Sequence, residues 1–228
     1  MKKISVNLLT AIALTLPALV SCQKDDLPAP AFVNAAPNAN RVLTPVFTVE
    51  ESSCWSGTQV FIGAEISMNS YPDDAEIYYT DDGTTPSKTN GTKYDGTLYK
   101  IPAAAQTTLK AIAYRDGWET SEVMSTTYTV PQLGTPKLSV YNWYPDKILL
   151  NWNDVDNADY YTVTYVKQNS GEKPASKNVS RLVRYTYLDQ EYGNLPSGTT
   201  YDITIQARSD RWMPSEIYST TGYTTGRP

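Results

Sequence analysis

The chain has 228 residues, with 19 basic and 24 acidic side chains and a formal net charge of −5. It contains no histidine, which excludes a histidine general base, a Ser-His-Asp or Cys-His nucleophile and any histidine-ligated metal. The acidic balance argues against nucleic acid as a partner, because phosphate contacts need clustered lysine and arginine.

The first 21 residues have the pattern of a secretory signal peptide. Lys2 and Lys3 form a positive start, and residues 4–20 form an apolar run that is too short for a transmembrane span. The run leads into Leu19-Val20-Ser21-Cys22, which resembles the lipobox of bacterial lipoproteins. The resemblance implies that residues 1–21 are removed and that Cys22 carries acyl chains such as palmitate, which anchor the mature protein in a membrane.

Residues 22–43 are predicted to form a lipidated, flexible tether, because they contain three prolines and no apolar periodicity. Gln23-Lys24-Asp25-Asp26 resembles the acidic signal that sends lipoproteins of one Gram-negative group to the cell surface. The resemblance implies an outer-membrane lipoprotein exposed at the cell surface. The alternative is that these residues are simply a polar tether.

Residues 44–130 are predicted to form a first domain of short strands. Strands are expected over residues 45–49, 59–64, 76–80, 98–101, 109–114 and 123–130. Asp81-Asp82-Gly83 is predicted to form a hairpin turn, in which the glycine takes a positive φ. The run from Ile77 to Pro86, with Asp116-Gly117-Trp118 further on, resembles the chitobiase/hexosaminidase C-terminal-like (fibronectin III-associated) domain, which implies a β-sandwich.

A short linker from Pro131 to Pro136 leads into a second predicted domain, residues 134–226. Strands are expected over residues 137–140, 148–152, 160–167, 183–188, 200–208 and 217–224. Trp152, the run Ala158-Asp159-Tyr160-Tyr161-Thr162-Val163 and the run from Leu195 to Tyr201 resemble a fibronectin type III domain. The resemblance implies that Trp152 lies in the core and that the Tyr201 hydroxyl bonds a backbone group upstream.

The two predicted domains also resemble each other. Residues 113–122 and 207–216 align without a gap at an offset of 94, each with an Asp-x-Trp loop followed by Ser-Glu. The overall prediction is therefore an all-β chain of two tandem immunoglobulin-like or fibronectin III-like β-sandwiches after the signal peptide and tether. The predicted core consists of Ile77, Tyr79, Leu109, Ala111, Trp152, Val163, Tyr201, Ile203 and Ile205.

No catalytic constellation can be assembled from these residues. The carboxylates fall in predicted turns, where aspartate caps the backbone, so we expect no enzyme activity, no cofactor and no metal. The run Asp154-Val155-Asp156-Asn157-Ala158-Asp159 leaves calcium as an alternative to a plain polar loop. Once Cys22 is lipidated, Cys54 has no partner for an intrachain disulfide and is expected to be a small buried residue.

The candidate ligand-binding residues are aromatic side chains at predicted loop tips: Trp118, Trp143, Tyr144 and Trp212. Flat aromatic faces flanked by polar groups suit stacking on sugars or peptides. The alternative for Trp118 and Trp212 is packing on their own hairpins. Two classes of function stay open: a binding or adhesion module for a glycan or partner protein, and a structural spacer or cell-envelope component without a selective ligand.

Overall fold

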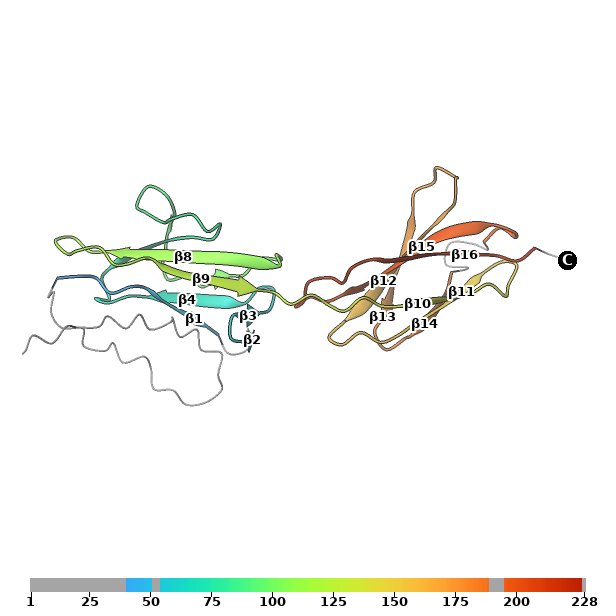
Figure 1. The fold of residues 1–228 in the computed structure, drawn as a ribbon, viewed down its shortest axis with the longest axis horizontal. Coiled ribbons are helices and arrows are strands. Elements are labelled where there is room, and N and C mark those ends of the chain that lie inside the picture. Colours follow the sequence, from blue (N-terminus) through green and yellow to red (C-terminus); the bar gives the residue numbers. More distant parts are fainter. Residues whose placement is uncertain (1–39, 51–53, 189–194, 227–228) are drawn as a thin grey trace, which may run out of the picture.

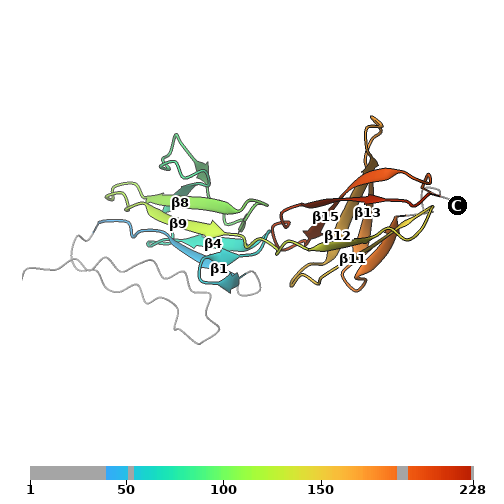
Figure 2. The ribbon, with the colours of Figure 1, turned by 45° about the vertical axis from the view of Figure 1, so that its right-hand side comes forward.

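The computed structural model describes residues 40–50, 54–188 and 195–226. These residues form two β-sandwiches that follow one another along the long axis of the molecule (Figure 1, Figure 2), which confirms the predicted all-β fold class. No helix in the described part of the chain is long and apolar enough to cross a membrane. The predicted signal peptide, Cys22 and most of the tether lie outside the described residues.

The first sandwich consists of a three-stranded and a six-stranded sheet. The smaller sheet has the order β1-β4-β7 and the larger has the order β2-β3-β9-β8-β5-β6. The strand bounds are β1 Val46–Val49, β2 Cys54–Ser56, β3 Gln59–Val60, β4 Glu65–Asn69, β5 Glu76–Thr80, β6 Thr92–Lys93, β7 Tyr99–Lys100, β8 Gln106–Tyr114 and β9 Met124–Thr129. In β8 the buried Leu109, Ala111 and Ala113 alternate with more exposed neighbours, the period expected for a strand with one face in a core.

The second sandwich has a three-stranded sheet, β10-β11-β14, and a four-stranded sheet, β13-β12-β15-β16. The strand bounds are β10 Leu138–Tyr141, β11 Ile148–Trp152, β12 Tyr160–Lys167, β13 Ala175–Ser180, β14 Tyr185–Leu188, β15 Thr200–Arg208 and β16 Tyr218–Tyr223. All pairings in it are antiparallel. Trp152 is buried as predicted, with its ring edge-on to Tyr161 at a centroid distance of 5.4 Å.

The sequence repeat corresponds to a repeated structure. The Ser121 hydroxyl accepts from the Ala113 N–H (2.8 Å) and donates to the Glu122 carbonyl (2.8 Å). In the second sandwich, the Ser215 hydroxyl accepts from the Ala207 N–H (3.0 Å) and donates to the Glu216 carbonyl (2.7 Å). The two serines therefore tie together equivalent hairpins, and the predicted common hairpin is confirmed.

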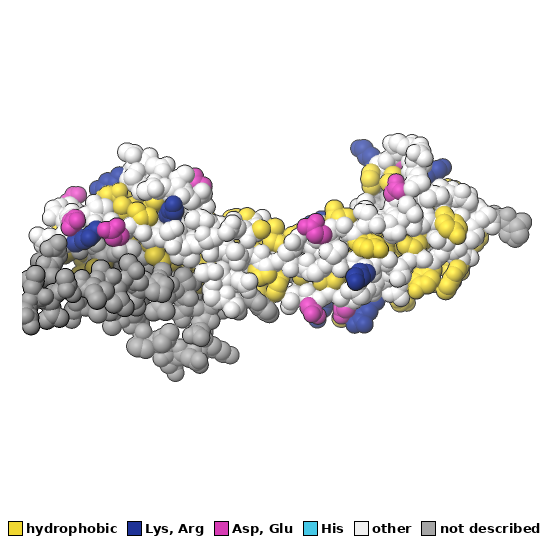
Figure 3. All heavy atoms as spheres, viewed as in Figure 1, with side chains coloured by type: hydrophobic (Ala, Val, Ile, Leu, Met, Phe, Trp, Pro, Cys, Tyr) yellow, Lys and Arg dark blue, Asp and Glu magenta, His cyan; other side chains and the backbone are white. Residues whose placement is uncertain are grey.

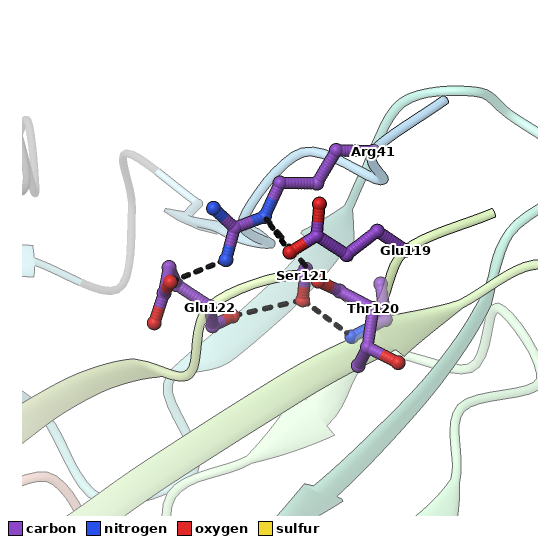
Figure 4. A network of polar contacts seen from close by, with 6 residues as sticks. Arg41, Glu119, Thr120, Ser121 and Glu122 are labelled. Carbon is purple, nitrogen blue, oxygen red and sulfur yellow. Dashed lines mark hydrogen bonds and ion pairs between the residues drawn. The ribbon is translucent and has the colours of Figure 1, made fainter. Parts of the chain in front are cut away.

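The repeat extends to the way in which the chain enters each sandwich. Arg41 pairs in parallel with Glu119 and forms an ion pair with Glu122 (Figure 4). Gln132 pairs in parallel with Met213, and its amide donates to Glu216. In each sandwich, the incoming chain therefore pairs with the loop that follows Trp118 or Trp212, respectively.

The junction between the sandwiches is built from side chains and main chain of both. The Ile62 N–H donates to the Arg211 carbonyl (3.0 Å), and the Arg211 guanidinium lies 3.7 Å from the Phe61 ring centroid. Phe61 also contacts Trp212, at a centroid distance of 6.1 Å. Met213, from the second sandwich, packs against the core of the first.

Several strand predictions were wrong. The expected strand 59–64 ends at Val60, and the central strand β4, which follows Gly63, was not predicted. The edge strand β13 was also missed. Asp82 and Gly83 (φ +81°) do turn the chain, but they form no tight hairpin. The strand that β5 pairs with after this turn is β6, which begins only at Thr92, so a long loop joins the two strands.

Two side-chain predictions also need correction. Tyr79 is only half-buried and packs edge-on against Tyr99. The Tyr201 ring is buried as predicted, but its hydroxyl has no hydrogen-bond partner among the described residues. The ring instead packs against Tyr165, at a centroid distance of 6.3 Å. The other predicted core residues are buried.

Candidate recognition surface

The outer face of the sheet β10-β11-β14 carries a row of aromatic side chains. Tyr141 lies opposite Leu149, and Leu149 lies opposite Tyr187, so the three form one cross-strand row. Because side chains alternate between the two faces of a strand, this row points away from the core that holds Ile148 and Leu150. The row is therefore a surface feature held by strand register.

The turn between β10 and β11 adds two further rings to this face. Trp143 is 68% exposed, and its ring centroid lies 5.0 Å from that of Tyr141. Tyr144 lies 6.0 Å from Tyr187, which in turn lies 6.5 Å from the exposed Tyr185. We call Tyr141, Trp143, Tyr144, Tyr185 and Tyr187 the aromatic strip.

Hydrogen bonds hold the turn that carries Trp143 and Tyr144. The Thr225 N–H donates to the Tyr144 carbonyl (2.9 Å), and the Tyr223 N–H donates to the Asn142 side chain (2.8 Å). Because the turn is bonded to the last strand and its extension, its two rings are presented from a fixed support. Figure 3 shows hydrophobic side chains gathered toward the end of the second sandwich that lies away from the first, where β11 and β14 lie.

A single cation is embedded in the aromatic strip. The Lys147 ammonium lies 4.5 Å from the Tyr144 ring centroid and 4.7 Å from the Tyr187 centroid. Both distances are within the range of a cation–π contact. The strip therefore combines apolar ring faces, tyrosine hydroxyls and one positive charge.

Trp118 and Trp212 lie elsewhere and already have packing partners. Trp118 packs against the core of the first sandwich, and the Arg115 guanidinium lies 4.5 Å from its ring centroid. Trp212 packs against the second core and against Phe61 at the junction. The structure thus brings Trp143 and Tyr144 into one surface and leaves Trp118 and Trp212 outside it.

A shallow pocket of about 330 Å³ lies beside Trp212, between the linker and the loop after β11. Asp154, in that loop, accepts from the Tyr161 hydroxyl (3.2 Å) and pairs with Arg184 (3.1 Å). Asp159, at the end of the loop, accepts from the Ser209 hydroxyl (2.7 Å) and the Asp210 N–H (3.1 Å). These carboxylates stabilise the loop, and within the described ranges no three acidic or sulfur side chains are grouped as a metal would require.

Cys54 differs from its prediction. It is half-buried in β2 rather than fully buried, and its sulfur is in a disulfide. The sequence has one other cysteine, Cys22, which lies outside the described residues. A sulfur that carries a thioether-linked lipid cannot form a disulfide, so lipidation of Cys22 and an intrachain disulfide of Cys54 exclude each other.

Sequence reasoning found the turn aromatics but missed Tyr141, Tyr185, Tyr187 and Lys147. A signal for two of them was present, because Tyr185 and Tyr187 alternate with Thr186 and Leu188, which are buried. Such alternation indicates an outward-facing pair. The sequence could not show that these tyrosines lie beside Trp143 and Tyr144.

Fold and site together define a tandem-sandwich protein with an outward-facing aromatic strip on its second sandwich. Residues 66–128 match the family described as Fn3 associated, so the first sandwich contains a fibronectin III-associated domain, as predicted. The second sandwich, with sheets β10-β11-β14 and β13-β12-β15-β16, is fibronectin III-like.

Three solved structures are similar to parts of the chain. One is a computationally redesigned β-sandwich protein, with 23% identity over 41% of this chain and 96% of that one and a TM-score of 0.35. Another is the fn3 domain of the human collagen α1(XX) chain, with 21% identity over 42% of this chain and 88% of that one and a TM-score of 0.37. The third is a two-domain fibronectin type III segment of chicken tenascin, with 19% identity over 71% of this chain and 93% of that one and a TM-score of 0.37. No match was found among curated proteins.

Proposed function

We propose that this protein is a non-enzymatic lipoprotein, displayed at the cell surface, that binds glycan through the aromatic strip. The observation that carries the proposal is the meeting of five aromatic side chains on one outward sheet face, three of them from strands and two from a turn. Solvent-facing strand positions are usually polar, so two groups of rings on either side of Leu149 need an explanation.

Glycan is the ligand class that best suits this surface. The C–H face of a sugar ring stacks on an aromatic ring, and the tyrosine hydroxyls can donate and accept hydrogen bonds at the ring edges. A flat sheet suits an extended polymer better than a small molecule, which prefers a concave pocket. A partner protein is the alternative ligand, because exposed tyrosine and tryptophan also favour protein interfaces.

Rigid presentation of the rings supports binding. Tyr141, Tyr185 and Tyr187 are held by strand pairing, and Trp143 and Tyr144 by the hydrogen bonds of their turn. Ordering such side chains on binding costs little conformational entropy, which preserves more of the contact energy as affinity.

The lipid anchor determines where the surface acts. Acyl chains on Cys22 would hold the protein in the outer membrane, and the tether would carry the sandwiches away from it. The support for this part is the lipobox-like Leu19-Val20-Ser21-Cys22 and the acidic Gln23-Lys24-Asp25-Asp26. Replacement of Cys22 by alanine should release the protein from membranes, and retention of the variant would contradict the anchor.

A spacer is the second candidate function, and the junction favours it. Main-chain hydrogen bonds link Met213 to Pro131 and Leu133, and Phe61 lies against both Arg211 and Trp212. Contacts of this kind limit rotation between two sandwiches, as a spacer of fixed length requires. The two functions are compatible, because a rigid stalk can also carry a binding face.

The test is binding of the mature chain with Cys22→Ala to a glycan array. Trp143→Ala and Tyr187→Ala should each abolish binding without unfolding the protein. Tyr114→Ala is the matched control, because Tyr114 also forms an edge-on pair, with Tyr78, but in the first sandwich. Binding that survives both strip substitutions, or a protein that binds no glycan, would refute the proposal and leave the spacer or a protein ligand.

A further inference from the structure

Lys147 differs from two other cations that lie over aromatic rings, Lys88 and Arg115. The Lys88 ammonium lies over Tyr114 but also pairs with Glu76 (3.5 Å). Arg115 lies over Trp118 but pairs with Asp74 (3.0 Å). Lys147 contacts two rings and has no carboxylate partner among the described residues, so its charge is not balanced by an ion pair.

The surroundings of Lys147 leave this charge available. Asp146, its neighbour in the turn, forms no ion pair with it, and the Asp146 carbonyl accepts from the Leu195 N–H (3.0 Å). Arg184, just before β14, is already paired with Asp154 (3.1 Å). Lys147 is therefore the one strip-embedded cation, among the residues described, that can meet a negative group on a ligand.

We propose that the aromatic strip selects acidic glycans, polymers whose sugars carry a carboxylate or a sulfate, with Lys147 as the anion contact. This inference rests on the proposed function. The rings of Tyr144 and Tyr187 hold the ammonium in place, so the anion meets a positioned donor rather than a mobile side chain. Charge-assisted hydrogen bonds to such a donor are the stronger kind.

A neutral glycan fits the same surface less well. A polymer that covers Tyr144 and Tyr187 also covers the ammonium between them and removes water from it. Burying a charge without a counter-charge is costly, and an acidic sugar supplies that counter-charge. The remainder of the protein opposes acidic ligands, since the mature chain has 17 basic and 24 acidic side chains, so an acid preference would have to arise locally.

The experiment compares matched ligands on the mature chain with Cys22→Ala. The probes are polygalacturonate and its fully methyl-esterified, neutral form, together with dextran sulfate and dextran, measured by isothermal titration calorimetry at two salt concentrations. We expect tighter binding of both acidic polymers than of their neutral partners. Lys147→Gln should weaken acidic binding about tenfold, the loss of one charge-assisted hydrogen bond. The same substitution should tighten neutral binding, because a neutral polymer then buries no unpaired charge. Lys147→Arg should retain the preference.

Lys88→Gln is the matched control, because it also removes a cation from over a tyrosine, and it should leave all affinities unchanged. If the acidic and neutral forms bind equally well, and Tyr187→Ala abolishes the binding of both, the acid selectivity is overturned but the proposed glycan function stands. An acid preference that Lys88→Gln weakens as much as Lys147→Gln would also overturn it, because the effect would then be general electrostatic attraction. Binding of none of the four polymers, together with a blank array, would refute the glycan function itself.

Discussion

Removal of the Ser215 hydroxyl should destabilise the second sandwich through one buried amide. Ser215 is 2% exposed, and its hydroxyl accepts from the N–H of Ala207, which is 0% exposed. In Ser215→Ala that N–H loses its side-chain acceptor and no water can reach it. A buried donor without a partner costs about 1–3 kcal/mol.

The assay is urea unfolding of the mature chain, followed by tryptophan fluorescence. Each 1 kcal/mol lost should also lower the melting temperature by about 4–8 °C in a domain of this size. Ser121→Ala is the internal replicate, because its hydroxyl accepts from the buried Ala113 N–H in the first sandwich. Ser215→Thr, which keeps the acceptor, should recover part of the loss. A change below about 0.5 kcal/mol in both alanine variants would refute the reasoning, because that is the scatter of surface substitutions.

Three further predictions follow from other parts of the molecule. Phe61→Ala removes the ring that contacts both Arg211 and Trp212. Small-angle scattering should then show a broader distribution of inter-sandwich distances, while each sandwich stays folded. An unchanged scattering profile would mean that the main-chain bonds alone fix the junction. Burial raises the pKa of Tyr128, and burial together with the Asp81 carboxylate raises that of Tyr99, above the ordinary 10.0. The unfolded chain therefore loses these protons first, so stability should be full below about pH 10 and fall as the pH rises beyond it; a melting temperature that is the same at pH 9 and pH 11 would contradict this. Finally, the denatured, unreduced protein from membranes should have one reactive thiol, Cys54, if Cys22 is lipidated, whereas a disulfide would leave none.

Much of the fold could be predicted, because its strands alternate between buried and exposed positions. The bounds of β5, β11, β12 and β15 are those expected from sequence. The missed strand β13 has the sequence Ala-Ser-Lys-Asn-Val-Ser, in which only Val179 is buried, so it carries almost no apolar signal. An edge strand of this kind is held by its neighbour β12 rather than by its own composition.

The aromatic strip was less predictable, because it depends on register between strands that are distant in sequence. Tyr141 and Tyr187 are 46 positions apart and meet only because both lie opposite Leu149. A shift of one residue in either pairing would turn one of these rings into the core. The contact of Trp212 with Phe61 joins the two sandwiches, so it could not be derived from either domain alone.

The repeat relates the turn that carries Trp143 and Tyr144 to the junction between the two sandwiches. In the first sandwich, the connection leading into β4 carries Phe61 and Ile62, which contact Arg211 and Trp212 of the second. The corresponding connection in the second sandwich, leading into β11, carries Trp143 and Tyr144. Trp143 there is 68% exposed. One topological position thus packs against the next sandwich in the first repeat, whereas in the second repeat it carries the exposed Trp143.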